Sequence, residues 1–174
     1  MFKGLIEFFV LVLFILFIIT SPSRATEGAF INYLVNAGKG NIADSKAITL
    51  GQTFDKSHLK LKYEVGAYFD HRKGATSSGL GMVGAGIRPT AGQFYISFYQ
   101  KVGLITHIDQ WLGYPFPQFG EELSIGLLSK DGAISIGFVY NHISNGGIDS
   151  LWGKGSPNRG RDFMGLQIGF PILW

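Results

Sequence analysis

Apolar and polar residues alternate along most of the chain, and this alternation limits the folds that the chain can adopt. From Leu59 to Asp70, apolar or aromatic residues hold the odd positions, while lysine, glutamate, glycine, tyrosine and aspartate hold the even ones. In the last segment, apolar residues hold every even position from Met164 to Trp174. Successive side chains of a β-strand point to opposite faces, so a period of two predicts strands with one apolar face.

The same pattern predicts an all-β chain after residue 25, because no later segment shows a convincing helical period. Turn-rich stretches of glycine, asparagine, aspartate and lysine, such as 38–41 and 130–132, separate the alternating segments. The predicted strands are 29–37, 46–54, 59–70, 80–88, 94–103, 122–128, 133–144 and 162–174.

The N-terminal segment is typical of an export signal. An apolar run of twelve residues, Phe8 to Ile19, follows a lysine, and the small residues Ser23 and Ala25 stand at the positions that a signal peptidase reads. A helix that spans a bilayer needs about 20 apolar residues, so an uncleaved anchor is the less favoured alternative. We predict a signal peptide over residues 1–25 and a mature domain over residues 26–174.

Composition excludes several classes of site and partner. The formal net charge is +3, and the lysines and arginines are scattered along the chain, so we expect no nucleic-acid partner. The chain has no cysteine, which rules out disulfides and thiolate metal sites. Three of the four histidines, His58, His71 and His107, show no metal-ligand spacing, and we predict no metal and no cofactor.

Eight alternating strands can close either as a soluble lipocalin-like barrel or as a membrane barrel, and the expected interior distinguishes the two. A lipocalin hides its apolar face inside. The non-apolar faces here carry residues such as Lys60, Lys62 and Glu64, which suit the filled polar interior of a small membrane barrel. The final Trp174, preceded by alternating apolar residues, resembles the C-terminal signal of bacterial outer-membrane barrels. We therefore predict an eight-stranded antiparallel transmembrane β-barrel in the Gram-negative outer membrane.

Three residues with hydrolytic chemistry fall on the lipid-facing sides of the last two predicted strands. His142 and Ser144 share one face of segment 133–144, and Asp162 shares the apolar face of segment 162–174. An imidazole, a hydroxyl and a carboxylate together can form a catalytic triad. A band of polar residues at the membrane interface is the alternative explanation, and spacing alone leaves both open.

The sequence HISNGG at 142–147, followed by PNRGRD at 157–162 and a final strand, resembles the lipid A 3-O-deacylase (PagL) family. That family is an eight-stranded outer-membrane barrel that hydrolyses the ester at position 3 of lipid A. The specific resemblance is confined to the stretch from 142 to 162. It implies Ser144 as nucleophile, His142 as general base and Asp162 as orienting acid, with Asn158 and the backbone amide of Gly147 forming the oxyanion hole.

The resemblance also implies lipid A in lipopolysaccharide as the substrate of a membrane-embedded enzyme without metal or cofactor, and it leaves a homo-oligomer open. The family's acid is commonly glutamate, so Asp162 reaches one methylene less. We further expect Glu121 and Glu122 to flank a strand at the barrel rim. Lys154, Arg159 and Arg161 are candidates to bind lipid A phosphates, with a solvated loop as the alternative.

Two other functions compete with deacylation. The outer-membrane phospholipase A resembles the same stretch through His-x-Ser-Asn-Gly, but it is a twelve-stranded barrel with an asparagine in place of the acid and calcium at its site. Removing 25 of the 174 residues leaves 149, or about 12 per strand and connection for twelve strands and about 19 for eight, and only eight strands fit spans of roughly 9 to 11 residues. The remaining alternative is a structural barrel with an inactive triad.

Overall fold

The structure is a computed structural model of the chain, and it describes residues 26–37, 45–56, 59–70, 77–106, 117–144 and 160–171. These residues form strands and the turns that join or flank them. Among them, no helix is long and apolar enough to cross a membrane. The predicted signal peptide lies outside the described residues. The strands are β1 (Thr26–Asn36), β2 (Ser45–Lys56), β3 (Leu59–Asp70), β4 (Ser78–Ile87), β5 (Thr90–Ala91), β6 (Phe94–Ile105), β7 (Gln118–Leu128), β8 (Ser135–Ser144) and β9 (Arg161–Phe170).

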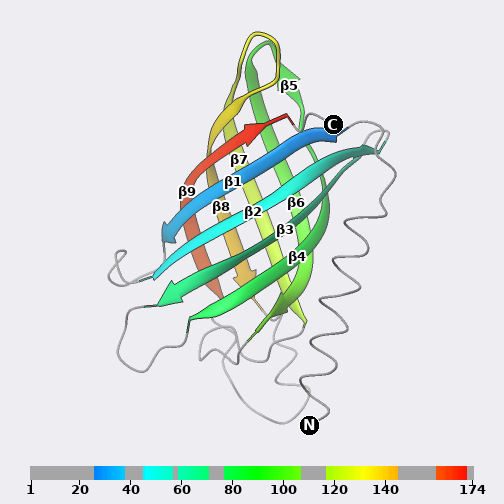
Figure 1. Cartoon of the computed structure of the whole chain (residues 1–174). Coiled ribbons are helices and arrows are strands. Elements are labelled where there is room, and N and C mark those ends of the chain that lie inside the picture. The colour runs from blue at the N-terminus through cyan, green and yellow to red at the C-terminus, as the bar shows by residue number, and fades with distance from the viewer. Residues whose placement is uncertain are drawn as a thin grey trace.

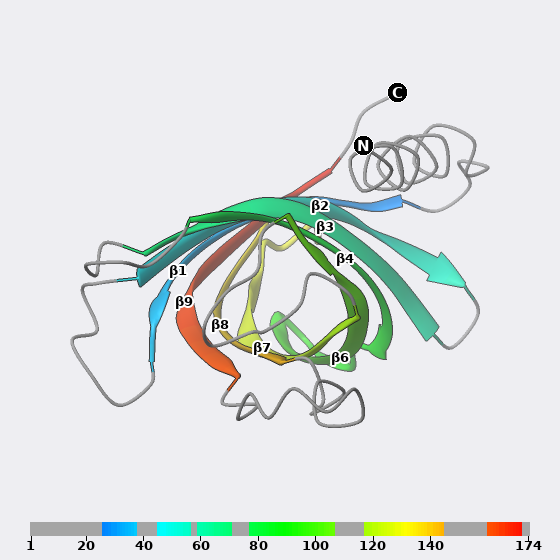
Figure 2. The ribbon, with the colours of Figure 1, turned by 90° about the horizontal axis from the view of Figure 1, so that it is seen from below.

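The strands close into one barrel in which every pairing is antiparallel (Figure 1). The first and last strands, β1 and β9, pair with each other, and β4 pairs with β6 past the two-residue β5. Figure 2, which looks at the barrel from below, shows the strands curving round a central lumen. Eight long strands therefore form the barrel wall, which confirms the predicted fold class.

The eight predicted segments each fall on one long strand, but their boundaries differ. Strand β7 begins at Gln118, four residues before the predicted start, and β9 ends at Phe170, while residues 172–174 of the last predicted strand lie outside the described residues. The prediction that Glu121 and Glu122 flank a strand at the rim is wrong for this reason, because both lie within β7. The four additional residues place Glu122 in the lumen, where it is fully buried, while its neighbour Glu121 faces outward.

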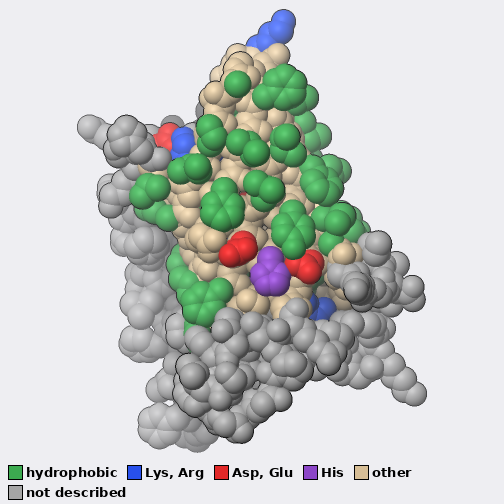
Figure 3. Space-filling view, turned by 180° about the vertical axis from the view of Figure 1, so that it is seen from behind, with side chains coloured by type: hydrophobic (Ala, Val, Ile, Leu, Met, Phe, Trp, Pro, Cys, Tyr) green, Lys and Arg blue, Asp and Glu red, His purple; other side chains and the backbone are tan. Residues whose placement is uncertain are grey.

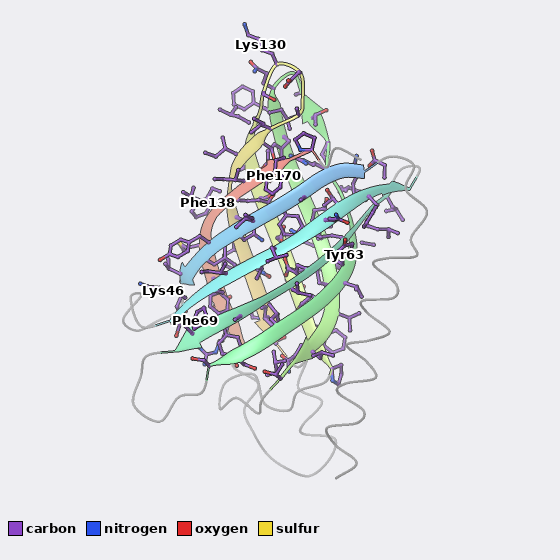
Figure 4. The ribbon with its side chains drawn as sticks, viewed as in Figure 1. Lys46, Tyr63, Phe69, Lys130, Phe138 and Phe170 are labelled. Atoms are coloured by element: carbon purple, nitrogen blue, oxygen red, sulfur yellow. The ribbon has the colours of Figure 1, made fainter. Side chains whose placement is uncertain are left out.

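The outer surface of the barrel wall is apolar, as the alternation predicts. On β8 the odd positions are buried and the even positions are exposed over most of the strand. Figure 4 shows Phe138 and Phe170 projecting away from the wall. A continuous apolar surface of this kind suits the hydrocarbon region of a bilayer. The exposed set on β6 to β9 includes Phe94, Ile96, Phe98, Leu123, Ile125, Leu127, Ile136, Phe138, Leu166, Ile168 and Phe170.

Four charged side chains meet inside the barrel, and we call them the lumen cluster: Lys62, Glu64, Lys101 and Glu122. Lys101 Nζ lies 2.6 Å from Glu64 Oε1 and 3.0 Å from Glu122 Oε2. Lys62 pairs with Glu122 and lies 3.9 Å from Glu64 Oε2. The four side chains are at most 1% exposed. Two positive and two negative charges thus neutralise one another where water cannot solvate them.

Apolar side chains fill the lumen at the end where β8 finishes and β9 begins. Antiparallel pairing brings the ends of β1, β3, β6 and β8 to the same level as the starts of β2, β4 and β9. The barrel wall at this end is therefore backed by close packing, and the outward side chains of β8 and β9 stand on a firm support. The cluster consists of Leu34, Ala47, Tyr68, Leu80, Met82, Ile105, Val139, Ile143 and Phe163.

Candidate active site on the outer wall

The end of β8 carries three outward-facing polar residues in succession. Alternation along the strand turns Asn141 and Ile143 into the lumen, and it turns Tyr140, His142 and Ser144 toward the outside. Whether a residue of β8 points into the lumen or outward therefore depends only on whether its position is odd or even. His142 and Ser144 are partly exposed, so each is accessible to a molecule that lies against the barrel wall.

The adjacent strand β9 brings Asp162 directly opposite His142. The two residues are partners in the antiparallel register of β8 and β9. His142 Nδ1 and Asp162 Oδ1 are 2.8 Å apart, and their side chains are 32% and 36% exposed. An ionised carboxylate only accepts hydrogen bonds, so Nδ1 carries the hydrogen, and Nε2 of the neutral ring is left as an acceptor.

Tyr140 makes a second hydrogen bond to the same carboxylate oxygen. Its hydroxyl donates to Asp162 Oδ1 over 2.5 Å. The sequence alone does not single out Tyr140, although this residue stands two positions before His142 on the same face. The signal was present in the alternation, but a tyrosine on a lipid-facing strand is ordinary, and only the pairing of β8 with β9 shows what its hydroxyl reaches.

Ser144 is the last residue of β8 and continues the outward row from His142. Its partner on β7 is Phe119, which is also outward and exposed. Residues i and i+2 of a strand are roughly 6.5 to 7 Å apart at Cα, so the hydroxyl and the imidazole are within side-chain reach of each other. The two predicted oxyanion-hole residues, Gly147 and Asn158, lie outside the described residues.

Gly160 approaches the imidazole from the residue before β9. Its φ is +58°, a left-handed conformation that favours glycine. A Cβ atom at this position would stand 2.5 Å from His142 Cε1 and 3.0 Å from Nε2. The backbone therefore closes one side of the ring, and no side chain fits there without displacing it.

A second carboxylate flanks His142 from the other neighbouring strand. Glu121 on β7 is the register partner of His142, and its Oε1 accepts a hydrogen bond from Gln100 Nε2 over 3.3 Å. Figure 3 shows the result as a histidine between acidic side chains on a wall otherwise covered by hydrophobic ones. Among the described residues, Asp162 is the acid that bonds to the imidazole.

Arg161 does not face the outer surface, which contradicts both the hypothesis that it binds lipid A phosphates there and the alternative that it lies in a solvated loop. Strand β9 starts at Arg161, one residue before the predicted strand, and alternation turns this side chain opposite to Asp162. Arg161 is 5% exposed, donates from Nη1 to Ser45 Oγ over 3.2 Å, and its Cζ lies 5.0 Å from the centre of the Tyr68 ring. Lys154 and Arg159 lie outside the described residues.

The outward residues together can perform nucleophilic chemistry at the membrane. Asp162 holds one ring nitrogen of His142, and the other nitrogen can act as a base. Such a base can activate the nearby hydroxyl of Ser144 to attack an ester. The described part of the chain contains no group of three or more histidine, cysteine, aspartate or glutamate residues that could hold a metal ion.

The chain resembles known proteins in sequence and in fold. Residues 48–171 match the family model described as lipid A 3-O-deacylase (PagL). A solved structure, titled as the crystal structure of the outer membrane enzyme PagL, superposes with a TM-score of 0.58 at 18% sequence identity. The superposition covers 82% of this chain and 99% of that one, and at this identity it shows the shared barrel fold. The search of the curated proteins found no match.

Proposed function

The chain belongs to the lipid A 3-O-deacylase (PagL) family, and from that membership we propose that it is a serine esterase that removes the acyl chain ester-linked at position 3 of lipid A. The observation that carries the proposal is the 2.8 Å contact between His142 Nδ1 and Asp162 Oδ1 on the outer wall, with Ser144 two residues along the same face. In a soluble enzyme such a site would lie in a cleft. Here it lies where the acyl chains of a lipid would be.

In the proposed reaction, Ser144 is the nucleophile and His142 is the general base. Nε2 of His142 takes the hydroxyl proton as Ser144 Oγ bonds to the carbonyl carbon of the ester. The bond from that carbon to the sugar oxygen then breaks, and the proton on Nε2 passes to the departing oxygen. Water then attacks the acyl-serine carbon while Nε2 takes its proton, the bond from that carbon to Ser144 Oγ breaks, the proton returns to Oγ, and a 3-hydroxy fatty acid leaves.

The charges that develop during this reaction need partners. Asp162 stabilises the imidazolium that forms on His142 and keeps Nε2 directed outward. By resemblance to the family, Asn158 and the backbone amide of Gly147 are the donors that receive the oxyanion of the tetrahedral intermediate. All of these groups belong to the protein chain, so the proposed mechanism uses no metal and no cofactor.

The outer wall supports a location in the outer membrane of a Gram-negative bacterium. Exposed apolar residues surround the site on β7, β8 and β9, among them Leu123, Phe138 and Leu166. Lipid A in such a membrane presents its acyl chains to this surface and its sugar near the interface. A polar triad is tolerated there because the cost of polar groups on a barrel surface falls toward the interface.

The test is mass spectrometry of lipid A after lipopolysaccharide is incubated with the purified barrel. We expect loss of one 3-hydroxyacyl chain, with fragmentation that locates the loss at position 3. A Ser144→Ala variant that folds normally, as judged by its mobility on unboiled gels, is expected to leave lipid A intact.

Two outcomes would point away from the proposal. Release of acyl chains from glycerophospholipids, with lipid A unchanged, would indicate a phospholipase. Unchanged lipids of both kinds with a folded wild-type barrel would indicate a structural barrel whose triad does not react.

A further inference from the structure

We infer that Tyr140 is a positioning residue of the proposed active site, which holds the carboxylate of Asp162 so that Asp162 can hold His142. The inference rests on the proposed function, because it assigns to Tyr140 a part in the same reaction. It adds a fourth side chain to the three that the sequence identifies.

The geometry places two donors on one oxygen. The Tyr140 hydroxyl lies 2.5 Å from Asp162 Oδ1, and His142 Nδ1 lies 2.8 Å from the same atom. Tyr140 and His142 are two residues apart on one face of β8, and Asp162 faces both from β9. A carboxylate that accepts from two donors of a rigid strand has far less freedom to rotate than one that accepts from the imidazole alone.

The surroundings explain why such a donor is needed. Along β9 the outward neighbours of Asp162 are Met164 and Leu166, and along β8 the residue before Tyr140 on the same face is Phe138. A carboxylate on an apolar wall has few water molecules to bond when lipid covers it, and an unsatisfied charged group is costly there. The Tyr140 hydroxyl supplies a hydrogen bond that does not depend on water.

The short side chain of Asp162 also explains why a second hydrogen-bond donor is needed. Asp162 lies directly opposite His142 in the β8 and β9 register, where facing Cβ atoms are about 4.5 to 5.5 Å apart. An aspartate has only two rotatable bonds and spans this gap in few rotamers. A second anchor on Oδ1 selects the rotamer that reaches Nδ1, which leaves Nε2 free to act as the proton acceptor in the proposed reaction.

The experiment compares Tyr140→Phe with wild type in the full chain, using lipopolysaccharide as substrate. Phenylalanine keeps the ring and removes only the hydroxyl. We expect kcat to fall on the order of 10-fold to 100-fold, the effect of one hydrogen bond to a charged group, with KM within about twofold. Tyr33→Phe is the matched control, because Tyr33 is an outward tyrosine on β1 with a similar exposed fraction, 47% against 37% for Tyr140.

A double-mutant cycle separates positioning from packing. If Tyr140 acts through Asp162, Tyr140→Phe should cost little further kcat, about twofold or less, once Asp162→Asn is present. Unchanged kcat in Tyr140→Phe, or an equal loss in both backgrounds, would overturn the inference while leaving the proposed function in place.

A spectroscopic measurement tests the positioning without activity. In protein labelled with 15N-histidine, the Nδ1–H proton of His142, assigned by its loss in His142→Gln, is expected in wild type and in Tyr33→Phe. It should broaden or disappear in Tyr140→Phe as the carboxylate is released. Persistence of a sharp signal in Tyr140→Phe would overturn the inference, even if the wild-type barrel proved inactive and the proposed function failed.

Discussion

The barrel wall separates two polar clusters that are built in opposite ways. The lumen cluster has two lysines and two glutamates, all at most 1% exposed, and each charge is paired with the opposite sign. The outer cluster of Tyr140, His142 and Asp162 is roughly one-third exposed, and its contacts converge on a single oxygen.

The difference shows how polar groups are used in this fold. The charges of the lumen cluster neutralise one another, so removing one partner leaves a buried charge unpaired. In the outer cluster the carboxylate orients the imidazole by one nitrogen only, and the other nitrogen can take a proton. The lumen cluster is therefore expected to support stability, and the outer cluster is expected to support reaction.

The largest expected effect comes from Asp162→Asn. The amide can present its NH₂ group to Nδ1 and favour the wrong tautomer, so kcat should fall by about 10⁴-fold, as in other triads. The free energy of unfolding should change by about 1 kcal/mol or less, because the pair is partly exposed. Kinetics on lipopolysaccharide measure kcat, and urea titration of the folded fraction measures the free energy of unfolding. A large loss of stability in Asp162→Asn would contradict the expectation that the outer cluster supports reaction and not stability.

Glu122→Gln should lower the free energy of unfolding and leave kcat nearly unchanged. Two buried lysines would then face one glutamate, and we expect the free energy of unfolding to fall by about 3 to 5 kcal/mol. The same urea titration measures this, and kcat of the folded fraction should remain within about twofold. Stability equal to wild type would mean that the lumen cluster does not hold the barrel together.

Gly160→Ala should have a mixed, smaller effect. An alanine at φ +58° costs about 1 to 2 kcal/mol of backbone energy, and its Cβ would also push the His142 ring, which should lower kcat. Gly132→Ala is the matched control, since Gly132 has φ +72° but no atom within 4 Å of an added Cβ. We expect the two variants to lose similar stability, while only Gly160→Ala loses kcat. Equal kcat in both would argue against close support of the ring.

Glu121→Gln should have the smallest effect. Glu121 and Glu122 are neighbours in sequence but lie on opposite sides of the wall, so the two glutamine variants differ only in which cluster they touch. Glu121 flanks His142 without bonding to its ring, and we expect kcat within about twofold of wild type and stability within about 0.5 kcal/mol. A loss of kcat as large as that of Asp162→Asn would assign the orienting role to Glu121.

The alternation of inward and outward side chains along each strand explains which features of this barrel the sequence predicts. Alternation predicts the strands, and the polar residues on their other faces place the apolar side chains outside, which gives the outward direction of His142, Ser144 and Asp162. It could not place Glu122, because the residues that open β7 include a phenylalanine, a glycine and a glutamate whose pattern does not mark the start of a strand. A one-residue error at the start of β9 likewise hid the inward direction of Arg161.

Side-chain contacts between strands could not be predicted from the sequence for a different reason. The bond from Tyr140 to Asp162 and the approach of Gly160 to the imidazole depend on the register of β8 and β9, which are separated by a long connection. Register depends on the hydrophobic pattern and on the geometry of the connection, and a long connection does not fix it as a tight hairpin turn does. The resemblance to a family identified His142 and Asp162 as partners, but it carried no information on Tyr140.

The packed lumen has a consequence for how the proposed enzyme would meet its substrate. Apolar side chains fill one end of the barrel and paired charges occupy the region beside them, so lipid does not pass through the middle. Enzyme and substrate then share a two-dimensional phase and meet by lateral diffusion. The reaction velocity should follow the mole fraction of lipid A in the membrane, so that adding inert lipid slows the reaction even when the bulk concentration of lipid A is unchanged.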